Sequence, residues 1–384
     1  MAMGVRRAGG AAVLLPLADG GDGTLDVLKN PLGLKIRRSR VLDPLGRPVT
    51  ARWGYNPRTQ WAVVEMARAS GLALLKDHER NPLKTNSFGT GQLICSAVRA
   101  GARKIFLGLG GSATVDGGLG LLQALGARIT VQKAGQTVRL DRPFTGEDLE
   151  TLEGVDPSPA MRTMKGVQFR VLCDVRNSLL GPRGAARAFG PQKGATPKGV
   201  VRLERGLKRM AALVRSGRKD ISAVPGTGAA GGAAAGLQGF TNARLEMGTD
   251  TLFRLIGLDK QIQQADIVMT GEGRVDHSSW EGKALGELVR LCHRYKKPII
   301  VLAGEIGPGG TRRGVDVVPL GTPRMSRKEK MHKAKQLIAK AAAGCWKKQL
   351  KTTQRFRWFS LSSREAGRRA PSTGGGRAAE SRAG

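Results

Sequence analysis

Apolar residues along the chain form short continuous runs, separated by longer stretches with helical periodicity. Continuous runs are typical of strands buried on both faces, because strands with one wet face alternate between apolar and polar residues. Strands that alternate with helices predict an α/β fold whose parallel sheets are covered on both faces. The predicted strands are 13–17, 62–66, 104–109, 169–173, 266–270 and 299–303, and the predicted helices are 24–29, 91–100, 119–125, 284–295 and 328–343.

Glycine content and charge add to this picture. The chain of 384 residues has 55 Gly, clustered between the predicted elements, which indicates tight loops that approach a ligand. The formal net charge of +34 favours anionic partners, but the basic residues are scattered and do not gather in one stripe. Residues 351–384 are basic and poor in apolar residues after Phe359, so we predict a disordered basic tail there.

Cysteine usage and hydropathy bear on the compartment. The four cysteines form no C-x-x-C pair and have no metal-ligand spacing, which predicts reduced thiols in a cytoplasmic protein. The sequence has no apolar run of about 18 residues, so we expect no membrane span. Arg6 and Arg7 precede an apolar stretch as in a signal peptide, but Pro16 interrupts it and no cleavage site follows.

Two Gly-rich loops lie between predicted strands and helices. The loop 18–24 contains Asp19 and Asp22 at the carboxyl end of a strand, where ligands bind in α/β sheets. A turn with Asp22 as a helix cap is the equally weighted alternative. The loop 108–118 can cradle phosphate with its backbone amides. It also matches the dinucleotide fingerprint loosely, but an acidic residue about 20 positions on is missing, so an NAD enzyme is a poor alternative.

Two further loops carry charged side chains. Asp174 ends a predicted strand, and Lys193 lies in a loop bounded by Gly and Pro. An acid and a lysine in one cleft suit phosphoryl transfer, although Lys193 alone would be interpreted as a solvated loop lysine. Glu272, Arg274 and Asp276 alternate, so in an extended loop they could point one way and hold Mg²⁺ with an anionic substrate. A surface salt-bridge cluster is the alternative for these three residues.

The common nucleotide-binding signatures are absent from the sequence. Gly282-Lys283 is no Walker A motif, because His277 stands at the upstream Gly position and Ala284 follows the lysine. Neither an H-R-D nor a D-F-G kinase signature occurs. The four His residues show no triad or zinc spacing.

Several long and unusual stretches, spread over about 13–350, carry a more specific signal. They are 17–24 (LADGGDGT), 87–94 (SFGTGQLI), 108–126 (GLGGSATVDGGLGLLQALG), 173–195 (CDVRNSLLGPRGAARAFGPQKGA), 225–232 (PGTGAAGG) and 266–283 (DIVMTGEGRVDHSSWEGK). In this order they resemble the type I glycerate kinases of bacteria.

The resemblance implies two α/β domains with parallel, flavodoxin- or Rossmann-like sheets and an active-site cleft between them. One domain interrupts the other, so we assign 1–55 plus 285–350 to a discontinuous domain and 56–284 to an inserted one. The resemblance also implies transfer of the γ-phosphoryl group of ATP to D-glycerate, with Mg²⁺ as cofactor and 2-phosphoglycerate as the usual product. The sequence leaves a monomer and a homodimer open, and predicts neither a specific nucleic acid nor a membrane as partner.

On this interpretation we expect the ATP phosphates to lie against the loop backbone, and Asp174 or Asp276 to accept the hydroxyl proton. The other charged groups hold Mg²⁺ or neutralise the carboxylate and the transferring phosphoryl group. The expected nucleotide-binding residues are Asp19, Asp22, Gly110, Gly111, Ser112, Ala113 and Thr114; the metal ligands are Asp116 and Glu272; and the catalytic residues are Asp174, Lys193, Arg274, Asp276 and Lys283.

The chain also departs from the family pattern. Family members begin with a strand and an Ala-Pro-Asp-Ser-Phe-Lys loop, whereas only residues 1–12 precede the first predicted strand here, so we expect a truncated first domain. Val115 stands where the family has Asn, and Ser178 where it has Pro. An inactive, truncated homologue is therefore an alternative function. A nucleic-acid-binding protein is less favoured, because only 355–359 interleaves basic and aromatic residues.

Overall fold

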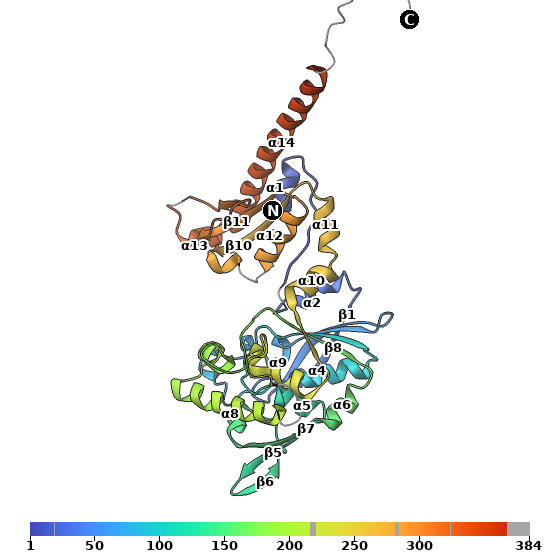
Figure 1. Ribbon diagram of the computed structural model, residues 1–384, viewed down its shortest axis with the longest axis vertical. Helices are drawn as coiled ribbons and strands as arrows, with labels where there is room; N and C mark the ends of the chain where they lie inside the picture. The colour runs from blue at the N-terminus through green and yellow to red at the C-terminus, as the bar shows by residue number, and fades with distance from the viewer. Residues whose placement is uncertain (19, 216–219, 281–283, 323, 367–384) are drawn as a thin grey trace, which may run out of the picture. The chain divides into compact units, whose positions relative to one another are not determined.

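The structure is a computed structural model that describes residues 1–18, 20–215, 220–280, 284–322 and 324–366 (Figure 1). Contacts divide the chain into two compact units. The larger unit comprises Leu15–Asp266 and Ser278–Lys297. The smaller unit comprises Met1–Leu14, Ile267–His277 and the residues from Pro298 onward. Both units combine helices with a sheet that contains parallel strands, which confirms the predicted α/β class.

The larger unit is built on a six-stranded sheet with the strand order β1-β2-β3-β4-β8-β9. The strands from β3 to β9 in this order pair parallel, whereas β1, β2 and β3 pair antiparallel, so the sheet is mixed. The bounds of its strands are β1 (Lys35–Leu42), β2 (Pro48–Asn56), β3 (Trp61–Glu65), β4 (Lys104–Gly108), β8 (Gln168–Cys173) and β9 (Arg244–Met247).

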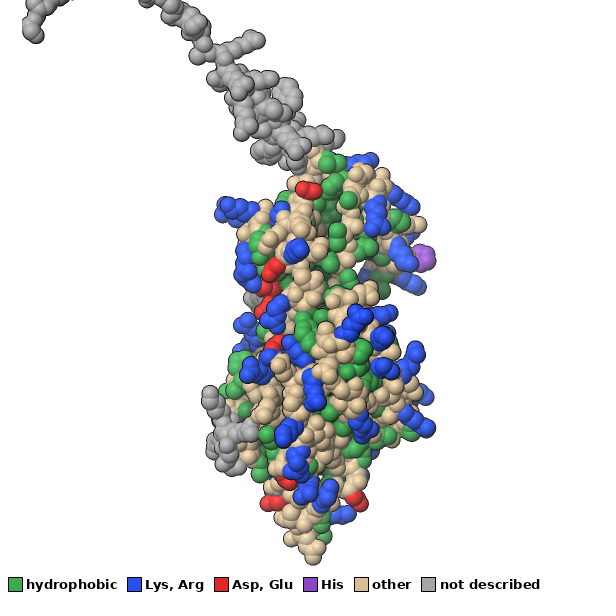
Figure 2. All heavy atoms as spheres, turned by 90° about the vertical axis from the view of Figure 1, so that its right-hand side faces the viewer, with side chains coloured by type: hydrophobic (Ala, Val, Ile, Leu, Met, Phe, Trp, Pro, Cys, Tyr) green, Lys and Arg blue, Asp and Glu red, His purple; other side chains and the backbone are tan. Residues whose placement is uncertain are grey.

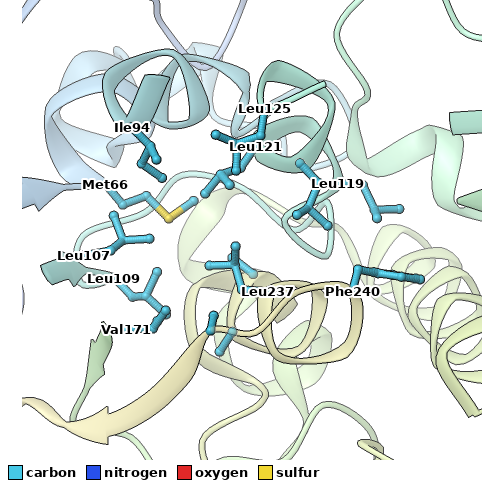
Figure 3. Close-up of a cluster of buried hydrophobic side chains, with 14 of the residues drawn as sticks. Met66, Ile94, Leu107, Leu109, Leu119, Leu121, Leu125, Val171, Leu237 and Phe240 are labelled. Atoms are coloured by element: carbon cyan, nitrogen blue, oxygen red, sulfur yellow. The ribbon is translucent and has the colours of Figure 1, made fainter. Parts of the chain in front are cut away.

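Both faces of the parallel part are buried, as the continuous apolar runs predict. Ile105 and Leu107 of β4 enter a large hydrophobic cluster, and Phe106 between them enters a smaller cluster on the opposite face. Figure 3 shows part of the large cluster, in which Leu107 lies near Ile94 and Leu121. Helices that contribute to the large cluster are α4 (Phe88–Arg99), α5 (Leu119–Ala124), α8 (Pro197–Arg215) and α9 (Ala229–Phe240); those of the smaller cluster are α2 (Thr24–Lys29) and α10 (Gly248–Leu255).

A three-stranded antiparallel sheet, in the order β6-β5-β7, adjoins the large cluster through Ile129 and Val131 of β5. Its strands are β5 (Arg128–Lys133), β6 (Gln136–Arg139) and β7 (Leu152–Asp156). The remaining elements of this unit are α3 (Ala67–Ser70), α6 (Ser158–Thr163), α7 (Ala185–Phe189), α11 (Leu258–Gln264), α12 (Ala284–Arg294) and the 3-10 turns η1 (Leu72–Leu74), η2 (Asp77–Glu79), η3 (Gly146–Thr151) and η4 (Pro191–Lys193).

The smaller unit has a parallel three-stranded sheet in the order β10-β11-β12. Its core includes Val5, Ile300, Leu302 and Ala342. Its elements are α1 (Ala2–Arg7), β10 (Val268–Val275), β11 (Ile299–Ile306), β12 (Asp316–Pro319), α13 (Arg327–His332) and α14 (Ala334–Ala366), and η5 (His277–Trp280) begins at its boundary.

The unit boundaries differ from the predicted domains. We assigned 1–55 and 285–350 to one domain, but β1 and β2 pair with β3 in one continuous sheet, so the strands before residue 55 belong to the larger unit. The helix α12 also belongs there, where it contacts α10 and α11. The pairing of β2 with β3 and the packing of α12 therefore place both domain boundaries at other positions than predicted.

The predicted strand at 13–17 is wrong. These residues are described and form no strand, and Val13 and Leu14 are 75% and 67% exposed. An apolar run becomes a strand only where a partner accepts its backbone, and no described strand pairs with this segment. The predicted disorder from residue 351 also differs, because α14 continues to Ala366. No Gly or Pro lies between residues 345 and 366 to end that helix, and 367–384 lie outside the described residues.

Candidate active site

Charged and Gly-rich segments of the larger unit meet at the carboxyl ends of its central parallel strands. Glu65 is the last residue of β3, Gly108 the last of β4, and Asp174 follows β8. Because β3, β4 and β8 are adjacent and parallel, these ends lie along one edge of the sheet. This edge is where open α/β sheets bind ligands.

Two of the Gly-rich loops lie directly against each other at this edge. The Gly110 amide donates to the Gly20 carbonyl at 3.3 Å. A Cβ on Gly108 would stand 2.6 Å from the same carbonyl oxygen, and one on Gly110 would overlap the Cα of Gly21. Glycine is required at positions 108 and 110 because the backbones of the two loops are in direct contact there. Asp19, a predicted nucleotide-binding residue of the first loop, lies outside the described residues.

The predicted phosphate cradle at 110–114 is only partly available. Gly110 and Ala113 use their amides internally, on Gly20 and on Ser70 at 2.9 Å. No hydrogen-bond partner for the amides of Gly111, Ser112 and Thr114 is found in the described part of the chain. Ser112, Ala113 and Thr114 are buried, whereas Gly110 and Gly111 reach the surface. The part of the cradle that an incoming phosphate can approach is therefore Gly110 and Gly111.

Lys193 points into this loop from the turn η4 and is only 3% exposed. Its Nζ donates to the Ser112 Oγ at 2.9 Å and to the Thr114 carbonyl at 2.8 Å. Burial lowers the pKa of Lys193 to about 7, and the negative charge of Asp116 partly opposes that shift. The alternative of a solvated loop lysine is therefore wrong.

Asp116 is fully buried on the far side of the same loop. Its Oδ2 accepts from the Ser87 amide at 2.7 Å and the Ser87 Oγ at 2.6 Å, and its Oδ1 accepts from the Gly118 amide at 3.0 Å. Burial raises the pKa of this carboxyl group, while these donors oppose the shift. The predicted metal role does not fit Asp116, because an ion would have to replace these donors inside a closed core.

Glu65 and Arg68 belong to the site although the sequence reasoning missed them. The nearly inaccessible Glu65 carboxylate accepts from the Leu25 amide at 3.0 Å and from the Arg68 Nε at 2.8 Å. Arg68 also pairs with the predicted residue Asp22 at 2.6 Å. The preceding Ala67 has its Cβ 3.2 Å from where a Cβ on Gly111 would stand, so the α3 segment borders the open part of the cradle. An acid within the apolar run 62–66 was the signal available in the sequence.

Asp174 is half-buried and is bonded to the start of α10. Its Oδ1 accepts from the Thr249 amide at 2.9 Å, and its Oδ2 accepts from the Thr249 hydroxyl. These bonds tie the end of β8 to the first turn of a helix, as an N-terminal cap does. In this arrangement Asp174 holds the fold at the edge of the site.

In the smaller unit, the predicted charged residues lie on and just after β10. The Arg274 side chain is 55% exposed, and its nitrogens lie 3.6 Å from carboxylate oxygens of Asp276 and of Glu305. The exposed Glu272 carboxylate accepts from the neighbouring Gly273 amide at 3.2 Å. The alternative interpretation, a surface salt-bridge cluster, therefore fits Arg274 and Asp276. Lys283 lies outside the described residues.

Comparisons with known proteins bear on the whole chain. A model of the Glycerate kinase family matches residues 1–348. The chain belongs to the glycerate kinase family. The glycerate 2-kinase of Escherichia coli (strain K12) is 40% identical over 295 residues, which are 77% of this chain and 76% of that protein. The glycerate kinase of Halalkalibacterium halodurans is 37% identical over 334 residues, 86% of this chain and 87% of that protein.

A solved structure is similar over nearly all of the chain. The crystal structure is of a protein from Salmonella typhimurium LT2 assigned as glycerate kinase 2. It has a TM-score of 0.74 and 36% sequence identity, and the match covers 92% of each chain. At this identity the similarity includes the sequence as well as the fold.

Two of the family-like stretches of this chain pack closely around the 108–118 loop. In 87–94, a Cβ on Gly91 would strike the Leu121 carbonyl, so glycine allows α4 and α5 to approach closely. In 225–232, Ala230, Gly231 and Gly232 have φ values of 53°, 64° and 87°, and the Gly231 carbonyl accepts from the Gly117 amide at 3.1 Å. The matched segments thus converge on one loop from different parts of the sequence.

The family implies a divalent metal, and the exposure of the carboxylates in this chain limits how such an ion could bind. The described residues include no group of three or more His, Cys, Asp or Glu that could hold a metal ion. Mg²⁺ needs no such cage, because it keeps several waters and usually binds one or two carboxylates together with substrate phosphates. The exposed Glu272 fits that mode and the enclosed Asp116 does not.

The surface of the protein shows no concentrated basic stripe on the face drawn in Figure 2, where Lys and Arg side chains are spread widely. Many arginines of the larger unit pair with acids, as Arg202 does with Glu150 at 2.6 Å. No helix in the described part of the chain is long and apolar enough to cross a bilayer.

Proposed function

We propose that this chain is an ATP-dependent glycerate kinase that converts D-glycerate to phosphoglycerate, with 2-phosphoglycerate as the product. The observation that carries the proposal is 40% identity to a glycerate 2-kinase over 295 residues, in a chain whose residues 1–348 match the family model. The reaction joins a glycerate hydroxyl oxygen to the γ-phosphorus and breaks the bond to the β–γ bridging oxygen. ADP leaves, and the hydroxyl proton passes to a base.

The nucleotide phosphates are proposed to lie at Gly110 and Gly111. The Gly111 amide has no described partner, and Gly111 is exposed, so it can donate to a phosphate oxygen. Arg68 follows Ala67, which borders Gly111, and its buried partner Glu65 fixes the direction of its guanidinium. The exposed Asp22 now pairs with Arg68, and a phosphate would compete for that contact.

The chemistry in such a reaction is mostly positioning and charge stabilisation. Because Asp174 is bonded to Thr249, we propose Asp276 as the group that accepts the hydroxyl proton. Arg274 and Lys283 are proposed to neutralise the substrate carboxylate and the transferring phosphoryl group. Mg²⁺ would shield the phosphate charges, with Glu272 as its proposed protein ligand.

The direct test is ADP formation by the purified full chain with ATP, Mg²⁺ and D-glycerate. Enolase added to the products converts 2-phosphoglycerate directly, whereas 3-phosphoglycerate requires a mutase first. We expect D-glycerate-dependent ADP release and a signal with enolase alone.

Matched substrates sharpen this test. D-lactate keeps the carboxylate and the 2-hydroxyl of D-glycerate and lacks only the 3-hydroxyl. ADP release with another hydroxy acid, together with background rates on D-glycerate, would contradict the substrate assignment. Background rates with every acceptor would favour the inactive homologue instead.

A further inference from the structure

Two oppositely charged side chains are enclosed within the larger unit at the loop that carries the proposed phosphate site. Lys193 is 3% exposed and Asp116 is fully buried, and both bond to groups of the loop or its flanks. A lysine that neutralises a phosphoryl group by contact must present its ammonium to the ligand. The ammonium of Lys193 is enclosed and cannot make such a contact, so Lys193 has another role.

We propose that Lys193 is a positioning residue that fixes the 110–114 loop from behind, so that Gly110 and Gly111 present their backbone to the nucleotide. The expected effect of Lys193 on catalysis rests on the proposed function, whereas its effect on the shape of the loop does not. The positioning role also departs from the contact role that the sequence predicts for Lys193.

The hydrogen bonds of Lys193 support this role. An ammonium has three donors, and two of them bond to the Ser112 hydroxyl and the Thr114 carbonyl. These acceptors lie two residues apart, so one Nζ fixes the turn between them. The Thr114 hydroxyl is buried without a hydrogen-bond partner among the described residues, so it supplies no alternative anchor.

The backbone that carries Lys193 is itself rigidly placed. The turn η4 begins at Pro191, whose φ is fixed by its ring, and ends at Gly194 with a φ of 91°. A Cβ on Gly194 would strike the Arg80 carbonyl, so this turn lies tightly against a second segment. A lysine on such a support can hold a loop in place.

Asp116 secures the other end of the loop. Its carboxylate joins the Gly118 amide to Ser87 at the start of α4, and the Ser87 hydroxyl also accepts from the Leu121 amide at 2.9 Å. The loop is thus held by Lys193 near residues 112–114 and by Asp116 near residue 118. Hydrogen bonds in a closed interior are strong and directional, which suits a loop that must keep its shape.

The test is a double-mutant cycle of Lys193→Met and Ser112→Ala in the full chain. Since Lys193 acts through the loop, each single variant should raise KM for ATP and lower kcat by roughly tenfold to hundredfold, with KM for D-glycerate changed less than about twofold. The double variant should be little worse than Lys193→Met alone. Additive losses would overturn the proposal, because a direct contact with ligand does not depend on Ser112.

Hydrogen exchange separates this inference from the proposed function, because it needs no turnover. Amides of 110–114 should exchange faster in Lys193→Met than in the parent protein, with little change in the smaller unit. Ile129→Val, a buried substitution in β5 away from the loop, is the control for a general loss of stability and should leave kinetics and loop exchange unchanged. Unchanged loop exchange in Lys193→Met would overturn the proposal even if kcat falls.

If Lys193→Met does not fold, the same two quantities, KM for ATP and the exchange of the 110–114 amides, are measured on Ser112→Ala alone. It removes one of the two Lys193 bonds and leaves the charge in place. Faster exchange at 110–114 with a raised KM for ATP supports the role, and an unchanged loop overturns it. An inactive parent protein would contradict the proposed function, while the exchange data would still decide whether Lys193 fixes the loop.

Discussion

Two Gly-rich segments of this chain occupy equivalent places, at the carboxyl ends of parallel strands, yet they are held in different ways. The loop 108–118 after β4 is enclosed and is bonded to the buried side chains of Lys193 and Asp116. The segment 271–276 covers the end of β10 and the next residue; its backbone pairs with β11, but its side chains except Val275 are largely exposed, and Arg274 lies 3.6 Å from Asp276 and from Glu305. Hydrogen bonds in a closed interior fix a geometry, whereas exposed ion pairs are weak and screened by salt.

This difference suggests what each segment can contribute. A fixed loop can present backbone donors to phosphates without reorganising, which is the larger part of charge stabilisation in phosphoryl transfer. A loose ion-pair cluster can exchange an internal partner for a substrate anion at little cost in stability. The predictions below test whether the two segments differ in this way.

The largest expected effect is the pH dependence of stability that Lys193 contributes. Burial lowers the pKa of Lys193 to about 7, whereas an unfolded lysine has a pKa of about 10.4. Between these values the unfolded chain binds one more proton, so the free energy of unfolding rises with pH by up to about 1.4 kcal/mol per unit. Lys193→Met removes this dependence.

Urea unfolding of the parent protein and of Lys193→Met at pH 7, 8 and 9 measures the effect. The stability of the parent relative to the variant should increase steadily over this range. Two parallel pH profiles would show that Lys193 is not enclosed as described, and the contrast between the two segments would fail.

The next effect is steric and compares two glycines directly. Gly110→Ala places a Cβ against the Cα of Gly21, which is backbone and cannot rotate away, whereas Gly273→Ala adds a methyl group where nothing lies within 4 Å. We expect Gly110→Ala to lose about 1–3 kcal/mol of stability and to lower kcat/KM. Gly273→Ala should stay within about 0.5 kcal/mol of the parent.

Thermal melts and initial rates of the two variants, measured side by side, check this pair. Neither glycine has a positive φ, so the comparison isolates contact from backbone strain. Equal melting temperatures would mean that the 20–24 and 108–118 loops do not touch in solution.

The core was predictable from sequence because burial on both faces leaves a continuous apolar run. The runs at 62–66, 104–109 and 169–173 are the central strands β3, β4 and β8. The run 13–17 has the same apolar character, but a strand also needs a partner, and composition carries no information about pairing. The same limit misplaced the domain boundary at residue 55, which depended on β2 pairing with β3.

For the site, the sequence indicated which loops matter better than what each side chain does. Lys193 and Asp116 were predicted from the sequence as a catalytic residue and a metal ligand, but their burial depends on segments far away in the sequence, such as Ser87 for Asp116. Glu65 and Arg68 carried no motif, and only the pairing of β3 with β4 brings them beside the loop. A sequence motif does not encode contacts between segments that are far apart in the sequence.

A smaller effect concerns Asp174, which borders the enclosed loop. Because it bonds the Thr249 amide and hydroxyl, Asp174→Ala should cost about 1 kcal/mol, as the loss of an N-terminal cap does. Asp174→Asn can still accept from the Thr249 amide with its Oδ1 and can donate from its Nδ2 to the Thr249 hydroxyl oxygen, so it should keep both stability and most of kcat. A loss of kcat by more than about 100-fold in Asp174→Asn, with an unchanged melting temperature, would instead identify it as the general base.

The smallest expected effect on stability is that of Arg274→Gln, and it tests the other half of the comparison. Arg274 is 55% exposed, as is Glu305, and its nitrogens lie 3.6 Å from carboxylate oxygens of Asp276 and of Glu305. Exposed pairs of this kind contribute about 0–1 kcal/mol, because water screens the charges and two long side chains must be held together. The melting temperature should therefore change little, and adding salt should reduce the remaining difference.

Kinetics should respond more than stability does, because the proposed function gives this guanidinium a substrate anion to bind. Arg274→Gln should raise KM for D-glycerate more than it changes KM for ATP. Lys193→Met should do the opposite and raise mainly KM for ATP. A fall of several degrees in melting temperature would mean that Arg274 is a structural anchor, and that the segment at the end of β10 is held as firmly as the loop after β4. Unchanged stability and unchanged KM would leave Arg274 as a solvated side chain and remove it from the proposed site.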